Sequence, residues 1–182
     1  TFILSTAMAT TPFQAWNTLD AWEQSHNEPG CQWKTVNYHR ASYKHCIRNY
    51  TDTVSSAIRT QGVWPDCLRL ITLWKKLASL PSTNFIDAGA NIGACTMLMG
   101  SQFDINVTAF EPNPENLFYL TKSLLANPDI NRKVLLYPFG LGAHAATFPM
   151  FVQRGNAGNS VLRVNVAAST KKSYDIQVFP LD

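Results

Sequence analysis

Two carboxylates and a glycine turn are the residues of this sequence that could do chemistry. Asp87 lies near the end of the apolar run 84–88, and Glu111 directly follows a second apolar run, 107–110. The turn 89–93 lies between them and both begins and ends with glycine. Glycine permits positive φ angles and lets a ligand approach the backbone, and a carboxylate at the tip of the next strand can accept the hydroxyls of a ribose. The stretch therefore predicts a nucleoside-binding site.

The spacing of the turn indicates which nucleoside is bound. A dinucleotide site needs G-x-G-x-x-G so that the backbone can approach a pyrophosphate, but Ala90 and Asn91 directly follow Gly89. Asp87 stands where it would repel a phosphate, and its charge suits a cationic ligand better. S-adenosylmethionine carries a sulfonium, an ammonium and a ribose, so it fits both acids. A nicotinamide-dependent oxidoreductase is the disfavoured alternative.

Strand and helix patterns alternate around this turn. Nearly continuous apolar runs are typical of strands buried in a parallel sheet, and Asn113 with Pro114 marks a helix start. The alternation predicts an α/β fold. Further along, the pattern changes to that of antiparallel strands around the loop 153–160. Strands are expected at 85–88, 107–110, 134–139, 146–152, 161–166 and 174–179, and helices at 94–103 and 114–127.

Four motifs in the second half of the chain occur in an order that resembles the FkbM-like S-adenosylmethionine-dependent O-methyltransferases. The Phe-Glu-Pro-Asn-Pro element at 110–114 is the most specific part of this resemblance, which covers about residues 62–182. The resemblance implies a Rossmann-like class I methyltransferase sheet and methylation of a hydroxyl on a sugar or another acceptor. It also implies a further strand after residue 182, so the sheet is expected to be incomplete at the C-terminus. The motifs are residues 85–93, 109–116, 140–142 and 155–160.

The residues that bind the cofactor are predicted from both arguments. Glu111 is assigned to the ribose hydroxyls, and Asp87 with the backbone of 89–93 to the methionine part. The alternative is a purely structural role, in which both acids only cap the turns that follow their strands. The resemblance also implies that Asn159 and Ser160 contact the acceptor. The expected cofactor-binding residues are Asp87, Gly89, Ala90, Asn91, Gly93, Glu111, Pro112, Asn113, Gly140 and Leu141.

The catalytic base is not identified by the sequence. Methyl transfer from a sulfonium requires the acceptor oxygen to be aligned with the methyl group and water to be excluded, and a general base assists. His144 and His39 are candidates, but a lone histidine is more often structural. The alternative function is a non-catalytic protein that binds the cofactor or a glycan.

Composition and charge narrow the class of protein. The chain has 182 residues, 46% of them hydrophobic and 15% charged, which is typical of a folded globular protein. The net charge of +3 is mild and the basic residues are scattered, so we expect a small-molecule or glycan acceptor and no nucleic-acid partner. The sequence does not indicate the oligomeric state.

Residues 1–80 are expected to form a helical extension or lid, and residues 81–182 the cofactor-binding domain. Within the extension, helices are predicted at 11–25, 51–59 and 66–80, and the segment 31–49 is predicted to be an irregular lid. The apolar start of the chain is either a frayed end or the tail of a signal peptide or membrane anchor upstream of residue 1. The sequence is therefore compatible with two locations, the secretory pathway or Golgi lumen and the cytoplasm.

The four cysteines give no metal-binding pattern, because no C-x-x-C occurs, and the spacing of the histidines also fits no usual zinc site. No metal is predicted. In an oxidising compartment we expect Cys31 to pair with Cys46, since both lie outside the cofactor-binding core. Cys95 is predicted to be a buried free thiol.

Overall fold

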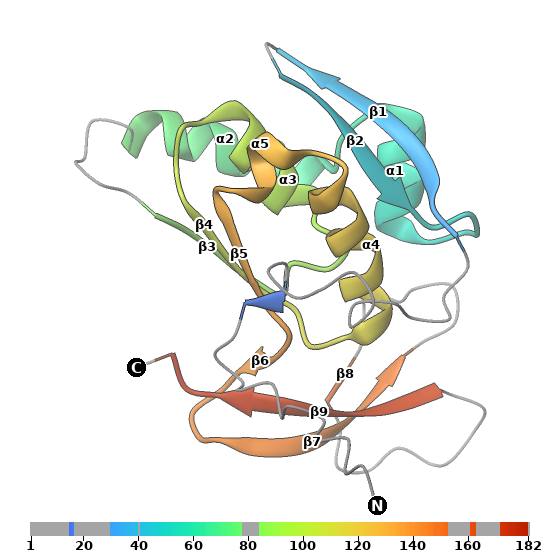
Figure 1. The fold of residues 1–182 in the computed structure, drawn as a ribbon, viewed down its shortest axis with the longest axis vertical. Coiled ribbons are helices and arrows are strands. Elements are labelled where there is room, and N and C mark those ends of the chain that lie inside the picture. The colour runs from blue at the N-terminus through green and yellow to red at the C-terminus, as the bar shows by residue number, and fades with distance from the viewer. Residues whose placement is uncertain are drawn as a thin grey trace, which may run out of the picture.

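The computed structural model describes residues 15–16, 30–39, 41–77, 84–152, 161–162 and 172–181. These residues form a mixed α/β structure that contains three sheets and five helices (Figure 1). The α/β class predicted from the sequence is confirmed.

A parallel sheet of three strands lies at the centre of the structure, in the order β3-β4-β5. The residue pairs Ala88 with Phe110 and Phe110 with Tyr137 are in register, so the three strands end at the same level. The predicted strands and helices of this region are confirmed, except that the third strand ends at Tyr137 and a short helix follows α4. The elements are β3 (Phe85–Ala88), α3 (Ala94–Gln102), β4 (Val107–Phe110), α4 (Pro114–Leu125), α5 (Pro128–Asn131) and β5 (Val134–Tyr137).

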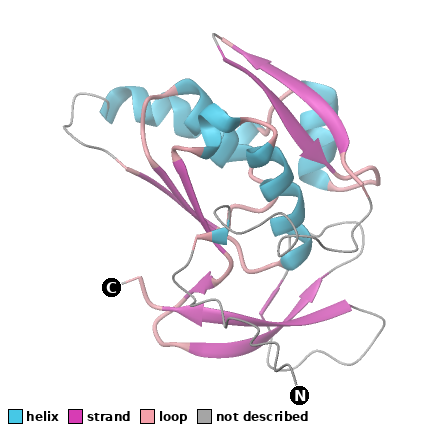
Figure 2. Ribbon diagram, in the orientation of Figure 1, coloured by secondary structure: helices cyan, strands magenta, loops and turns pink. Residues whose placement is uncertain are grey.

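Helices cover one face of this sheet. Side chains on the covered face, such as Ala109 and Leu136, are completely buried. On the opposite face, Ile86 is 49% exposed and Leu135 is 46% exposed. These two residues both align with Thr108 of the middle strand, so the exposed side chains form a row across the sheet. The helices drawn beside the sheet all lie on one side of it (Figure 2).

A β-hairpin precedes the parallel sheet in the chain. It consists of β1 (Gln32–Tyr38) and β2 (Ala41–Ile47), so the prediction of irregular structure for 31–49 is wrong. Burial alternates along β2 up to His45, so Tyr43 and His45 face inward, and the last two residues, Cys46 and Ile47, are both buried. Because these inward residues carry polar groups, the strand shows no alternation of plainly apolar and polar side chains.

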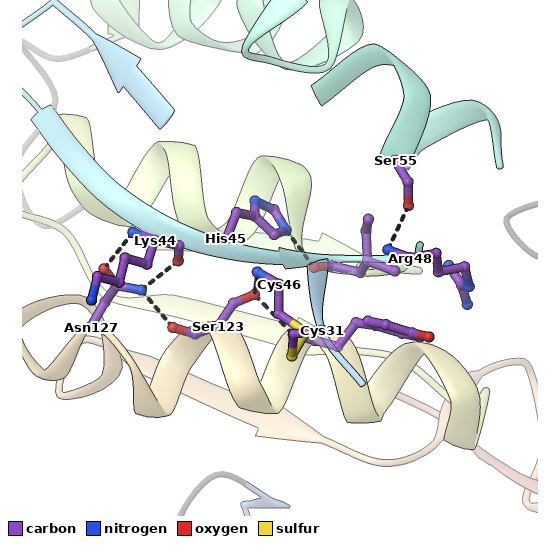
Figure 3. Close-up of a disulfide and its surroundings, with 10 residues drawn as sticks. Cys31, Lys44, His45, Cys46, Arg48, Ser55, Ser123 and Asn127 are labelled. Atoms are coloured by element: carbon purple, nitrogen blue, oxygen red, sulfur yellow. Dashed lines mark hydrogen bonds between the residues drawn. A yellow bond between two sulfur atoms is a disulfide. The ribbon is translucent and has the colours of Figure 1, made fainter. Parts of the chain in front are cut away.

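The hairpin is fixed to α4 and to the residues just after it by side chains rather than by a further strand. Lys44 exchanges two hydrogen bonds with the side chain of Asn127, at 3.0 and 2.7 Å, and the backbone N–H of Cys46 donates to Ser123 Oγ at 2.9 Å. These contacts satisfy backbone groups on the outer edge of β2 (Figure 3). The hairpin therefore packs on α3 and α4 as part of the core.

Two helices connect the hairpin to the parallel sheet, α1 (Thr53–Gln61) and α2 (Pro65–Leu77). Asp52 caps α1 by accepting a hydrogen bond from the N–H of Ser55 at 3.0 Å. Both helices are close to their predicted positions, although Asp66 lies in the first turn of α2 and does not precede it. No helix within the described ranges is long and apolar enough to cross a membrane.

A second sheet lies beyond the carboxyl ends of the parallel strands (Figure 1). Its strand order is β6-β9-β7-β8, and the predicted antiparallel pairing is confirmed for β7 with β8 and β9. The loop 153–160, residues 163–166 and most of the predicted helix 11–25 lie outside the described residues. The strands are β6 (Gly140–Leu141), β7 (Ala146–Val152), β8 (Val161–Leu162) and β9 (Lys172–Phe179).

Two disulfides join the four cysteines. Cys31 pairs with Cys46, as predicted, and Cys67 of α2 pairs with Cys95 of α3. The prediction that Cys95 is a free thiol is wrong, because α2 packs against α3 and brings the two Cα atoms to 5.1 Å. The second disulfide is anchored in the first turn of the helix that follows the glycine turn.

Candidate functional site

The predicted cofactor-binding residues gather at the carboxyl ends of the parallel strands. They are Asp87 near the end of β3, residues of the turn 89–93 after it, the segment 111–113 after β4, and Gly140 and Leu141 after β5. A Cβ atom added to Gly140 would lie 3.7 Å from Pro112 Cγ, so the second and third segments lie next to each other. The carboxyl edge of an open parallel sheet is the usual place for a ligand.

The glycine turn has the backbone conformation that its sequence predicts. Gly89 and Gly93 both have φ of 85°, and Asn91 has φ of 54°. The N–H groups of Gly89 and Ala90 donate to the carbonyl of Phe110 at 2.9 and 3.0 Å, which ties the turn to the end of β4. At Gly93 a Cβ atom would overlap the side chain of Leu120, so this position requires glycine for two separate reasons.

Glu111 connects the two loops at the strand ends. It is 5% exposed, and its Oε2 accepts a hydrogen bond from the N–H of Asn91 at 2.7 Å while its Oε1 accepts one from the N–H of Asn113 at 2.8 Å. Burial raises the pKa of Glu111. Hydrogen bonds from the backbone of Asn113 and Asn91 and from the side chain of Asn116 oppose this rise, whereas the charge of Asp87 adds to it. The Glu111 carboxylate is thus buried, accepts several hydrogen bonds and lies close to another acid.

Asp87 lies in β3, and its side chain is held by a residue in the first turn of α3. Its Oδ2 accepts a hydrogen bond from Thr96 Oγ1 at 2.6 Å. Burial raises the pKa of Asp87, and hydrogen bonds from the hydroxyl and backbone of Thr96 oppose the rise. Both acids therefore do make the turn-capping contacts expected of a purely structural role. These contacts also fix the two carboxylates in one place and orientation.

The acceptor capacity of Glu111 limits how it can bind a ribose. A carboxylate has about four acceptor positions, and the donors from Asn91, Asn113 and Asn116 use three of them. One further hydroxyl can be accepted without rearrangement. Binding of both hydroxyls of a ribose would require one of the present donors to move.

His45 of β2 contacts the backbone of the glycine turn from inside the core, a role that the sequence did not reveal. Its ring is completely buried, and Nε2 lies 2.9 Å from the carbonyl oxygen of Ile92. Burial lowers the pKa of His45 to about 4, so at neutral pH the uncharged ring donates from Nε2 to this carbonyl. The sequence of β2 gives no signal for this position, because it shows no alternation of apolar and polar residues that would place His45 inside.

Four aromatic rings pack where the parallel sheet meets the second sheet. Phe110 and Tyr137 are stacked with ring centroids 5.4 Å apart, and Phe139 contacts Phe179 with centroids 5.0 Å apart. Phe110 belongs to the Phe-Glu-Pro-Asn-Pro element at 110–114, and Phe139 is the last residue of the strand expected at 134–139. The rings provide an apolar wall at the strand ends, and Tyr137 is partly exposed.

The two histidines considered as bases are not brought together. His39 lies at the turn of the hairpin, where it lines a surface cavity of about 460 Å³ with Lys75, Gln102 and Phe103. Gln102 is the last residue of α3, so His39 is at the far end of this helix from the glycine turn. His144 is exposed in the connection between β6 and β7, and Asn159 and Ser160 lie outside the described residues.

The metal prediction and the comparisons add no further residue to the site. Within the part of the chain that the structure describes, no three His, Cys, Asp or Glu side chains are grouped to hold a metal ion. No family model, curated protein or solved structure matches the chain.

Proposed function

We propose that this chain carries the S-adenosylmethionine-binding part of a Rossmann-like class I methyltransferase of the FkbM-like family, which methylates a hydroxyl of a sugar or another acceptor. The observation that carries the proposal is the position of two acids, the partly buried Asp87 and the buried Glu111, at the ends of adjacent parallel strands on either side of a glycine turn. The family and the acceptor class are taken from the sequence motifs.

The electrostatics of this pair favour a cationic ligand. Burial raises the pKa of both carboxyls, and the charge of Asp87 raises the pKa of Glu111 further. A cation beside the two acids would relieve this repulsion and the cost of burying the charges. A diphosphate would instead add two negative charges at the same place.

Hydroxyl binding favours the nucleoside end of the same cofactor. Glu111 is fixed by the N–H groups of Asn91 and Asn113, and it keeps one acceptor position for a hydroxyl donor. Phe139 and its aromatic neighbours offer an apolar wall beside Gly140 for the base. The three segments would thus bind the charged, sugar and base portions of one ligand.

The chemistry expected of the chain is mainly alignment. When bound, S-adenosylmethionine supplies an electrophilic methyl group. Asp87 and the turn 89–93 would hold the methionine end and Glu111 the ribose, so that the acceptor oxygen can be aligned with that methyl group and water excluded. Among the described residues, the site contains no histidine that could act as the base, which leaves a non-catalytic binding protein as the second candidate.

The test is calorimetric titration of the purified chain with S-adenosylhomocysteine, S-adenosylmethionine and NAD. Binding of the first two and not of NAD is expected. Glu111→Ala should weaken their binding by about tenfold or more, because the variant loses a charge-assisted hydrogen bond. Asp66→Ala, which removes an exposed acid in the first turn of α2, is the matched control and should bind normally.

Two results would contradict the proposal. The first is a preference for NAD. The second is unchanged binding of S-adenosylhomocysteine by a folded Glu111→Ala variant. Methyl transfer to a panel of sugars would then separate an enzyme from a binding protein.

A further inference from the structure

Arg48 is a completely buried cation between the hairpin and α1. Its guanidinium lies 4.8 Å from the centre of the Tyr119 ring, its Nε donates to the hydroxyl of Tyr50 at 2.8 Å, and its Nη1 is 3.7 Å from Asp52 Oδ2. Its backbone N–H donates to Ser55 Oγ at 3.2 Å (Figure 3). Burial of an arginine is costly, so its contacts indicate why this position holds a cation.

The shortest of these contacts points toward the candidate site. Arg48 Nη2 donates to Asn116 Oδ1 at 2.5 Å. Because a guanidinium has only donors, it must face the oxygen of the amide, and the NH₂ group of Asn116 is then directed elsewhere. The side chain of Asn116 also hydrogen-bonds the carboxylate of Glu111. Arg48, Asn116 and Glu111 therefore form one chain of contacts across the core.

Pairing with Asp52 does not explain the position of Arg48. Within the described part of the chain, Arg48 Nη1 and Asp52 Oδ1 are both buried without a hydrogen-bond partner, although the two side chains are neighbours. The other oxygen of Asp52 is used to cap α1. The guanidinium is thus oriented for Asn116 at the expense of a better ion pair.

We propose that Arg48 is a positioning residue for Glu111: it fixes the amide of Asn116 so that this amide donates to the carboxylate and holds it in the orientation that receives the cofactor ribose. This inference rests on the proposed function for its ligand, whereas the coupling of Arg48 to Glu111 does not. A residue from the segment preceding the parallel sheet would then determine how well the cofactor-binding acid is preorganised.

The test uses the double variant Arg48→Met/Asp52→Asn. Removing both charges avoids leaving Asp52 buried alone, and asparagine still caps α1, so the variant is designed to fold. The first readout is the NMR titration of the Glu111 carboxyl carbon, with Asp87 as the neighbouring charged group in every sample. The second is the affinity for S-adenosylhomocysteine as a function of pH.

Two single variants complete the set. Arg59→Met is the matched control, because Arg59 bonds Gln32 and the carbonyl of Arg48 but has no described contact with Asn116. Arg48→Lys retains the buried charge and a donor, so partial rescue is expected. A purely structural role for Arg48 would lower the stability of the double variant and leave the titration of Glu111 unchanged.

The expected result is that Glu111 in the double variant titrates at higher pH than in the wild-type chain and that binding weakens about tenfold at neutral pH, with Arg59→Met unchanged in both. An unchanged Glu111 titration in the folded double variant overturns the inference, whatever the affinities show. If the wild-type chain binds no S-adenosylhomocysteine, the proposed function fails, and the NMR titration still decides whether Arg48 positions Glu111.

Discussion

His45 Nε2 and the carbonyl oxygen of Ile92 are 2.9 Å apart, although 47 residues separate them in the sequence. Through this bond a buried side chain of the hairpin holds the turn that follows the first parallel strand. The other ring nitrogen, Nδ1, is buried without a hydrogen-bond partner within the described part of the chain. The ring is therefore suited to the neutral form only, and protonation would disturb the turn.

Acid should destabilise the protein through His45. Its pKa is lowered from 6.5 to about 4 in the folded chain, so below about pH 6.5 the unfolded chain binds a proton that the folded chain does not. Stability is lost as the pH falls from 6.5 toward 4, by about 3 kcal/mol in total. Urea unfolding across this range should show a weaker decline for His45→Gln. His39→Gln, which removes an exposed histidine, should decline as the wild-type chain does.

Replacing Asp87 by asparagine should affect stability and binding in opposite directions. The pKa of Asp87 is raised in the folded chain, so its contribution to stability is complete below the unfolded value of 3.8 and is lost as the pH rises through the folded value. At neutral pH, Asp87→Asn should be at least as stable as the wild-type chain, because asparagine can still accept the bond from Thr96. Its affinity for S-adenosylmethionine should fall. Denaturation and calorimetry at pH 7 check both; a less stable variant with full affinity would contradict the functional role.

The glycine requirement at position 93 can be separated into two parts. Gly93→Ala should lower stability by about 2 kcal/mol or more, because it combines a positive φ with overlap of the Leu120 side chain. Gly62→Ala has nearly the same φ, 83°, and open space around the added methyl group, so a loss of about 1 kcal/mol is expected. Equal losses in urea unfolding would show that Leu120 relaxes freely.

Reduction of the disulfides should cost stability according to the length of chain that each one closes. The separations are 15 residues for Cys31–Cys46 and 28 for Cys67–Cys95, which correspond to about 3 and about 3.5 kcal/mol. Removing Cys67 and Cys95 together should also weaken cofactor binding, because Cys95 is in the first turn of α3. Removing Cys31 and Cys46 should lower stability more than affinity. Melting temperatures with and without reductant, and titrations of both double variants, test this.

The parallel sheet and its helices could be predicted because their signals are local. Glycines 89 and 93, the cap and proline at 113 and 114, and two apolar runs ending in acids each specify a conformation within a few residues. The same spacing identified Asp87 and Glu111, which the structure does bring to adjacent strand ends. The short helix α5 and the early end of β5 were missed at boundaries where such signals are weak.

The parts that support the site could not be predicted, because they depend on contacts between distant segments. Arg48 meets Asn116 across 68 residues, and Cys67 meets Cys95 only because two helices pack together. The hairpin was missed for a different reason. Its inward positions include His45, and a histidine is counted as polar in the alternating pattern that predicts a strand.

The row of exposed side chains on the parallel sheet affects the heat that the protein takes up on unfolding. Ile86 and Leu135 are about half hydrated already in the folded state, so unfolding exposes less new apolar surface at this face than at a face covered by helices. The heat-capacity change of unfolding should then be slightly smaller than it would be if helices covered this face. At about 0.45 cal/mol/K per Å² of apolar surface, two half-exposed side chains lower it by only about a few per cent of the usual total of about 12–15 cal/mol/K per residue. The curve of stability against temperature should therefore keep nearly its usual curvature.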